Sequence, residues 1–267
     1  MPRLHANGID IEYETQGDPK DPPMLMIMGL GAQLITWDDE LIEQLADRGF
    51  YVIRYDNRDS GLSTKMDAAG VLDALHIRAA HIVGASMGGF IAQLVAINHP
   101  EHTLSLTSIM SGPGGHDAIP PTPEASVFLV GKPGPNKADV IEFAVASKKI
   151  LGGEGNPFDA ELERAKAERA YERSYYPAGF GRQLVAILAS KTRIPALREL
   201  KVPTLVIHGA DDPLIPPENG RRVAAAVPGA RYIELPGAGH NLPPGTWKVV
   251  VDAIVENAKQ ASAASRR

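Results

Sequence analysis

The sequence predicts a doubly wound α/β fold, in which helices cover both faces of a mostly parallel sheet. Segments with apolar residues at helical spacing alternate with short apolar runs that have the pattern of strands buried on both faces. The length of 267 residues and the hydrophobic content of 44% suit one large globular domain, or a domain with an insertion. Five of the strand-like runs are PMLMIMG, FYVIRYD, HIVGAS, LSLTSIM and PTLVIHG.

The other elements of the core follow the same scheme along the chain. Near the N-terminus, Asn7-Gly8 separates two strand-like runs, which predicts an antiparallel hairpin. A further strand-like run, ARYIEL, follows PTLVIHG. We expect this core to comprise residues 1–111 and 199–267. Helical spacing predicts four core helices, over Trp37 to Asp47, Met87 to Asn98, Pro217 to Ala226 and Thr246 to Lys259.

The alternation of strand and helix breaks between Ser111 and Glu199. Glycine and proline are frequent in SGPGGHDAIPPTPEA and VGKPGPNKAD, and AELERAKAERAYERSYY is charged and helical. Seven of the chain's 15 aromatic residues lie in this segment, more than a solvated linker needs. We therefore expect a helical cap over residues 112–198, with Phe128, Phe143 and Tyr176 as candidate substrate-binding residues.

Composition argues against several classes of function. The formal net charge is −5 and no dense Lys/Arg cluster is present, so neither nucleic acid nor a membrane surface is an expected partner. The absence of cysteine excludes disulfides, thiolate nucleophiles and cysteine-bound metals. The start MPRLHANGID has no signal-peptide pattern, and no apolar run approaches the ~18 residues of a spanning helix. A soluble, cytoplasmic protein is the expectation.

Ser86 is the candidate nucleophile. It is the central residue of GASMG, a G-x-S-x-G sequence with a predicted strand before it and a predicted helix after it. Such an elbow raises the hydroxyl above the edge of the sheet where open α/β folds bind ligands. The alternative is a glycine-rich turn that carries an ordinary serine.

A serine hydroxyl needs a histidine that can take its proton. His240 is the candidate base because it follows the last predicted strand, in the loop PGAGHNLPPG, where small residues let a side chain reach over the sheet. His208 ends the run TLVIHG, a position typical of a satisfied, partly buried histidine. The six other histidines lie in weaker contexts.

A carboxylate must orient that histidine. Asp211 and Asp212 both follow a buried strand and stand between Ser86 and His240 in the chain. Pro213 biases Asp212 toward an extended backbone, which favours it without excluding its neighbour.

Acyl transfer also needs donors for an oxyanion. Met87 N–H lies at the start of the predicted helix, and Leu30 N–H lies in the small-residue turn Gly29-Leu30-Gly31-Ala32. An ordinary β-to-α turn would have the same composition as this second segment.

The chain resembles the α/β-hydrolase family over nearly its whole length. The motifs that carry this resemblance are MGLGAQLITW, VIRYDNRDSGLST, HIVGASMGG, HGADDPLIP and PGAGHNLP. The resemblance is strongest to its aclacinomycin methylesterase branch. It implies a carboxylester hydrolase with a helical cap, with Ser86, Asp212 and His240 as a triad and Leu30 and Met87 as oxyanion donors. The chain departs from the family in one place: only residues 66–80 separate GLSTK from HIVGAS, where relatives usually carry a longer loop and a full helix. MDAAGVLDALHI predicts a short crossover helix there.

These observations together predict a serine carboxylester hydrolase that needs no cofactor and no metal. The expected substrates are small-molecule esters with a small alcohol part, methyl above all, and an apolar acid part. A perhydrolase, an acyltransferase or a C–C bond hydrolase would use the same triad. A ligand-binding receptor could keep the same fold without catalysis.

Overall fold

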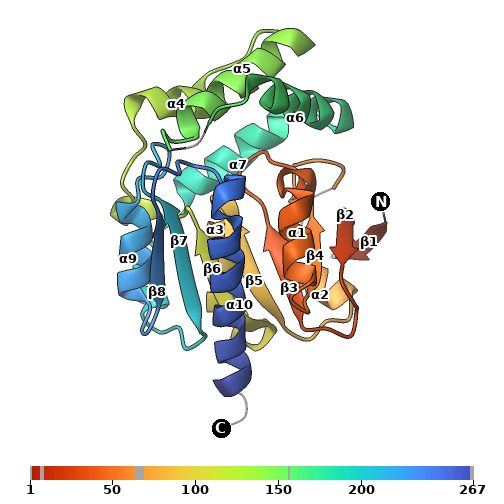
Figure 1. Cartoon of the computed structure of the whole chain (residues 1–267), viewed down its shortest axis with the longest axis vertical. Helices are drawn as coiled ribbons and strands as arrows, with labels where there is room; N and C mark the ends of the chain where they lie inside the picture. Colours follow the sequence, from red (N-terminus) through yellow and green to blue (C-terminus); the bar gives the residue numbers. More distant parts are fainter. Residues whose placement is uncertain (1, 7–8, 64–68, 156, 265–267) are drawn as a thin grey trace.

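The computed structural model describes residues 2–6, 9–63, 69–155 and 157–264 (Figure 1). Its eight strands form one sheet in the order β1-β2-β4-β3-β5-β6-β7-β8. The pairs β1–β2 and β2–β4 are antiparallel, and the other pairs are parallel. The predicted doubly wound, mostly parallel fold is confirmed. The strands are β1 (Arg3–Ala6), β2 (Ile9–Gln16), β3 (Pro23–Ile27), β4 (Tyr51–Tyr55), β5 (Ala80–Ala85), β6 (Thr103–Ile109), β7 (Thr204–Gly209) and β8 (Arg231–Leu235).

Alternation within each strand divides the core between the two faces of the sheet. In β3, Met24 and Met26 join one apolar cluster, and Leu25 and Ile27 join the other. The first cluster lies under α1 (Asp39–Ala46) and α10 (Trp247–Ala264). Because successive side chains of a strand point to opposite faces, a strand covered on both sides needs a continuous apolar run. The second cluster lies under α2 (Ala69–Ala74), α3 (Met87–Asn98), α8 (Ile194–Leu197) and α9 (Glu218–Ala226).

The four predicted core helices are present, within two residues of the predicted starts. The predicted hairpin is also present as the antiparallel pair β1–β2, and its turn residues 7–8 lie outside the described residues. The short crossover helix predicted between GLSTK and HIVGAS is α2, while residues 64–68 lie outside the described part of the chain. Short 3₁₀ helices cover Leu34–Thr36, Pro100–His102, Gly115–Asp117 and Pro244–Thr246.

The segment between β6 and β7 contains four longer helices: α4 (Pro123–Val130), α5 (Lys137–Leu151), α6 (Ala160–Arg173) and α7 (Pro177–Ala189). Thr122, Asn136 and Asp159 cap the first three by accepting hydrogen bonds from main-chain N–H groups of the first turn. In Figure 1, α4, α5 and α6 lie above the end of the sheet where the parallel strands finish. We call residues 112–198 the cap, and the division into core and cap remains a prediction.

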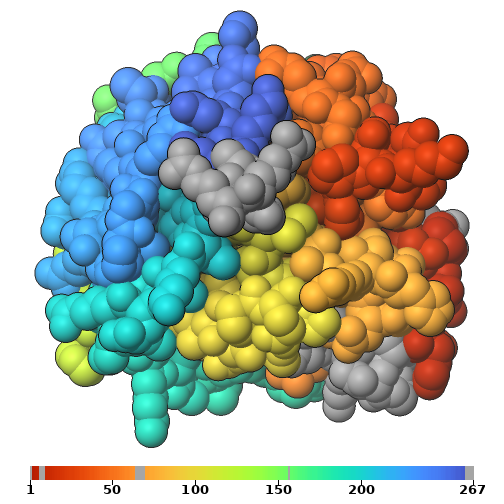
Figure 2. Space-filling view, turned by 90° about the horizontal axis from the view of Figure 1, so that it is seen from below, coloured from red at the N-terminus to blue at the C-terminus, as the bar shows by residue number. Residues whose placement is uncertain are grey.

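The two ends of the sheet differ in what they carry. Figure 2 views the end opposite the cap, where the connections lead into the parallel strands. Ser86, Asp212 and His240 each follow a strand, so they belong to the capped end.

Candidate active site

Ser86 occupies a strained turn between β5 and α3. Its backbone has φ 58° and ψ −122°, a conformation rare for a residue with a side chain, and its N–H donates to Ile109 C=O at 2.9 Å. The flanking glycines permit this turn, because a Cβ on Gly84 would lie 2.1 Å from Gly88 O and one on Gly88 2.0 Å from Ile27 O. The structure therefore has the sharp strand-to-helix elbow expected from G-x-S-x-G.

His240 and Asp212 form a close pair at the same end of the sheet. His240 Nδ1 lies 2.7 Å from Asp212 Oδ2. The other carboxylate oxygen, Oδ1, accepts the N–H groups of Leu214 and Ile215, each at 2.9 Å. Both carboxylate oxygens are thus engaged, and this fixes the carboxylate plane toward the imidazole.

The pKa of Asp212 reflects opposing influences. Burial is the strongest of them and raises the pKa, because it disfavours the charged form. The charge of His240 and hydrogen bonds from His208, His240 and Ile215 N–H outweigh burial and lower the pKa to about 2. The carboxyl group is therefore ionised at neutral pH and can orient a histidine and stabilise its protonated form.

Asp211 lies apart from this pair. Asp211 is exposed to solvent, and its main-chain N–H donates to Ala238 C=O at 2.9 Å. The two neighbouring aspartates, which sequence reasoning left open, therefore have different surroundings, and it is Asp212 that contacts His240.

His208 is a second histidine beside Asp212. It is fully buried, and its Nε2 lies 2.7 Å from Ile215 O and 3.5 Å from Asp212 Oδ2. We expected a satisfied, partly buried histidine at this position, but the residue is fully buried and its Nδ1 has no hydrogen-bond partner among the described residues.

The candidate oxyanion donors flank Ser86. The Gly29–Ala32 turn closes with a 3.2 Å hydrogen bond from Ala32 N–H to Gly29 C=O. A Cβ on Gly29 would lie 3.4 Å from Ser86 Oγ, so the turn adjoins the serine hydroxyl. Among the described residues, the N–H groups of Leu30 and Met87 donate no hydrogen bond. Met87 opens α3, whose N-terminal dipole favours negative charge.

Several polar residues around this turn were not predicted from the sequence. Asp56, which is fully buried, accepts Leu34 N–H at 2.7 Å and pairs with Arg173 of α6 at 2.7 Å. Gln183 of α7 accepts Gly31 N–H at 2.7 Å. Asp56 and Arg173, like Gly31 and Gln183, are more than 100 residues apart in the chain, and Leu34 is 22 residues from Asp56. No local motif connects any of these pairs.

The three candidate substrate-binding aromatics of the cap lie in different surroundings. Phe128 and Phe143 contact each other edge to face, with ring centroids 5.4 Å apart, and so connect α4 to α5. Tyr176 is 52% exposed and packs under the guanidinium of Arg182. A substrate contact for each of them remains a prediction.

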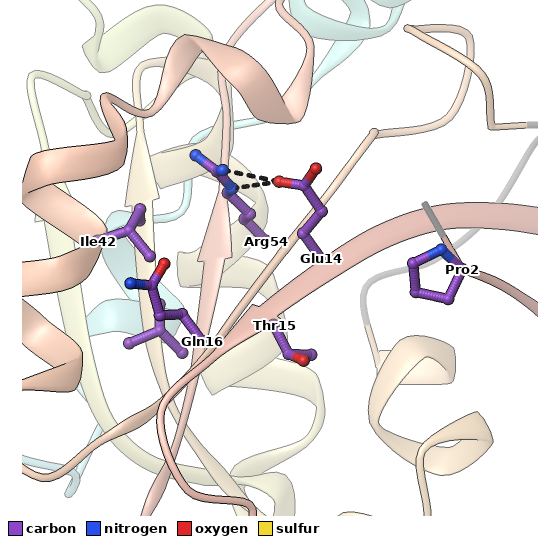
Figure 3. Close-up of a pocket in the computed structure, with 7 residues that line it drawn as sticks. Pro2, Glu14, Thr15, Gln16, Ile42 and Arg54 are labelled. Carbon is purple, nitrogen blue, oxygen red and sulfur yellow. Dashed lines mark hydrogen bonds and ion pairs between the residues drawn. The ribbon is translucent and has the colours of Figure 1, made fainter.

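A cavity of about 380 Å³ lies elsewhere, beside the antiparallel edge of the sheet (Figure 3). The guanidinium of Arg54 in its wall is bonded to Glu14, to Asp39 and to Trp37 C=O. Its donors are therefore already engaged, and we do not place the site there. The cavity is lined by Pro2, Glu14, Thr15, Gln16, Ile42, Val52 and Arg54.

The described residues contain neither a cluster of metal ligands nor a membrane-spanning helix. No three histidine or carboxylate side chains in them gather in a way that could hold a metal ion. No helix in the same residues is long and apolar enough to cross a membrane.

Comparisons with known proteins agree with this fold. The family model described as alpha/beta hydrolase fold matches residues 22–243. The rhodomycin D methylesterase DauP of Streptomyces sp. (strain C5) is 32% identical, over 93% of this chain and 95% of its own. DnrP of Streptomyces peucetius, also a rhodomycin D methylesterase, is 31% identical over the same shares. A solved meta-cleavage product hydrolase from Pseudomonas fluorescens IP01 superimposes with a TM-score of 0.82 at 21% identity, covering 98% of both chains. The chain therefore belongs to the α/β hydrolase fold family.

Proposed function

We propose that the protein is a serine carboxylester hydrolase with Ser86 as its nucleophile. The observation that carries this proposal is the 2.7 Å contact between His240 and an ionised Asp212, at the sheet end that also bears the strained Ser86 elbow. A histidine held in this way presents Nε2 as a base, which is what a serine hydroxyl needs to attack a carbonyl.

The residues then act in a defined order. Ser86 Oγ attacks the ester carbonyl carbon while His240 Nε2 takes the hydroxyl proton. The N–H groups of Leu30 and Met87 stabilise the negative oxygen of the tetrahedral intermediate. Its collapse breaks the bond to the alcohol oxygen, which receives the proton from His240. Water, deprotonated by His240, then attacks the acyl-enzyme and forms a second tetrahedral intermediate. Its collapse breaks the bond to Ser86 Oγ, which takes the proton back from His240, and the acid is released.

We infer that the substrates are small-molecule esters of a small alcohol, methyl above all, with an apolar acid part. Two relatives that match 93% of this chain are named rhodomycin D methylesterases, which supports a methyl ester. Exposed apolar residues on α4 and α7 support an apolar acid part, because Val127, Val130, Val185 and Leu188 are each more than half exposed.

A panel of methyl esters tests the proposal. Wild-type protein should hydrolyse aryl or long-acyl methyl esters with a burst, and an organophosphate should label one serine per chain. Ser86→Ala should abolish both. Product analysis with water, an alcohol and peroxide in competition separates hydrolysis from acyl transfer and perhydrolysis. Binding of an ester without Ser86-dependent turnover would contradict the proposal and support a receptor.

A further inference from the structure

The side chain of Gln183 bridges two loops, one of which is the Gly29–Ala32 turn beside Ser86. Its Oε1 accepts Gly31 N–H at 2.7 Å, and its Nε2 donates to Arg58 C=O. The two contacts determine which end of the amide faces which loop, since the opposite orientation would bring donor against donor and acceptor against acceptor. Gln183 is 7% exposed, so water does not readily replace either contact.

The hydrogen bond from Gly31 acts on the turn that carries Leu30 N–H. Gly29 C=O is bonded to Ala32 N–H, and because a peptide is planar and trans, Leu30 N–H points the opposite way from that carbonyl. Gln183 holds the next peptide, the one between Leu30 and Gly31. Leu30 is therefore fixed on both sides, and the turn adjoins Ser86 Oγ.

Without Gln183, the turn would have a second conformation open to it. Gly31 has φ +67°, as required at the third position of a type II turn. Glycine adopts negative φ as readily, and rotation of the Leu30–Gly31 peptide then gives a type I turn, in which Leu30 C=O takes the place of Gly31 N–H. The Gly29–Leu30 peptide keeps its direction within the turn, but the hydrogen bond that holds the turn to α7 is lost. Phe180, also on α7, packs on Gly31, since a Cβ there would lie 2.6 Å from its ring. Helix α7 thus selects one conformation of this turn.

We propose that Gln183 is a positioning residue, which holds the Gly29–Ala32 turn so that Leu30 N–H faces the oxyanion. This inference rests on the proposed function. It predicts that loss of the Gln183 amide affects the tetrahedral intermediate more than the bound ester, because the oxyanion forms only after attack.

The main variant is Gln183→Met, which keeps an unbranched side chain of similar length without the amide. We expect kcat to fall about 10- to 100-fold, less than the roughly 10² to 10³ lost with an entire oxyanion donor, and KM to change less than about threefold. Gln183→Glu keeps an acceptor for Gly31 N–H and should retain more activity than Gln183→Met. If Gln183→Met does not fold, Gln183→Asn withdraws both contacts by one methylene and serves in its place.

Arg182→Met is the matched control. Arg182 is the neighbouring residue of α7 and bonds to Asp59 and Tyr176, so its loss weakens cap contacts without touching the Gly29–Ala32 turn. We expect kcat within about threefold of wild type in this variant, whatever its change in Tm. A purely structural role of Gln183 would instead give equal losses of kcat at equal losses of Tm.

Binding of phenylboronic acid provides a second readout, because its adduct with a serine is tetrahedral and carries a negative charge. Its Kd should rise in Gln183→Met by a factor similar to the fall in kcat/KM. A Gln183→Met variant with wild-type kcat and wild-type boronate affinity would overturn the inference. Failure of the proposed function is a separate result, in which wild type itself shows no Ser86-dependent ester hydrolysis.

Discussion

Replacement of Asp212 by asparagine should reverse the tautomer of His240. Oδ1 of Asp212 accepts two main-chain N–H groups, so the asparagine must place its own oxygen there. Its NH₂ group then faces His240 Nδ1, which can only accept from it. The proton of the neutral imidazole moves to Nε2, and that nitrogen can no longer take a proton from Ser86.

The size of the effect follows from the buried contacts. To act as a base, His240 of the variant must carry its proton on Nδ1, which sets two donors against each other at a buried position. Each unsatisfied buried donor costs about 1–3 kcal/mol, and the carboxylate that stabilised the imidazolium is gone as well. The sum of about 4–5 kcal/mol corresponds to a loss of roughly 10³ to 10⁴ in kcat.

Steady-state hydrolysis of one methyl ester by three proteins measures this. We expect Asp212→Asn to fold normally and lose kcat by that factor, while Asp211→Asn, which changes an exposed carboxylate, loses less than about tenfold. A larger loss in Asp211→Asn than in Asp212→Asn would refute the reasoning and transfer the role to Asp211.

The same variant gives a prediction for pH. Because the pKa of Asp212 is lowered to about 2 in the folded protein, its ionisation stabilises the fold above the unfolded value of about 3.9. That contribution is lost as pH falls through about 2. The difference in unfolding free energy between wild type and Asp212→Asn should therefore not shrink between pH 7 and about 5, and should shrink only below about 4. A difference that already shrinks between pH 7 and 5 would contradict the lowered pKa.

Three further predictions concern the triad, the cap and its attachment. Ser86→Ala and His240→Ala should each remove most of kcat, and the double variant should be little worse than either, because triad members act as a unit; additive losses would contradict the triad. Tyr176→Ala should lower kcat/KM for an aryl methyl ester about 10-fold or more, the worth of one apolar pocket contact, but lower it for methyl acetate less than threefold. Equal losses on both esters would mean that Tyr176 supports the fold only. Arg173→Met leaves the buried carboxylate of Asp56 without its cation and should cost about 3–5 kcal/mol in urea unfolding. The control Lys166→Met breaks an exposed pair with Asp38 and should cost at most about 1 kcal/mol; similar costs for the two would contradict a buried ion pair.

The fold could be predicted from the sequence because local patterns determine most of it. A strand such as Met24 to Ile27 is apolar at every position because both of its faces are covered, and that signal needs no knowledge of its neighbours. The elbow at Ser86 is likewise encoded within five residues, by glycines whose missing Cβ atoms let strand and helix approach. His240 could be chosen because only one histidine follows the last strand.

What could not be predicted depends on contacts between distant segments. Asp211 and Asp212 have almost the same local sequence, and only the fold shows which of them contacts a residue 28 positions later. Gln183 stands among apolar residues of α7 with nothing local to distinguish it, and its partner Gly31 lies 152 residues earlier in the chain. The first pairing joins two loops of the core, and the second forms where α7 of the cap meets the core.

Contacts of the cap with two loops of the candidate site restrict how a substrate could enter. Glycines and prolines over residues 112–123 and 131–135 favour a cap that moves to admit it. Two contacts oppose such a movement. The main-chain N–H of His240 donates to Leu151 C=O, at the end of α5, at 2.6 Å, and α7 holds the Gly29–Ala32 turn through Gln183. Opening of the entire cap would break both contacts and displace the base and an oxyanion donor together. In the described residues α4 makes no hydrogen bond to either of these loops, but Thr122 before it donates its N–H to Pro213 C=O, next to Asp212, at 2.9 Å. The gating hypothesis therefore narrows to α4 and residues 131–135.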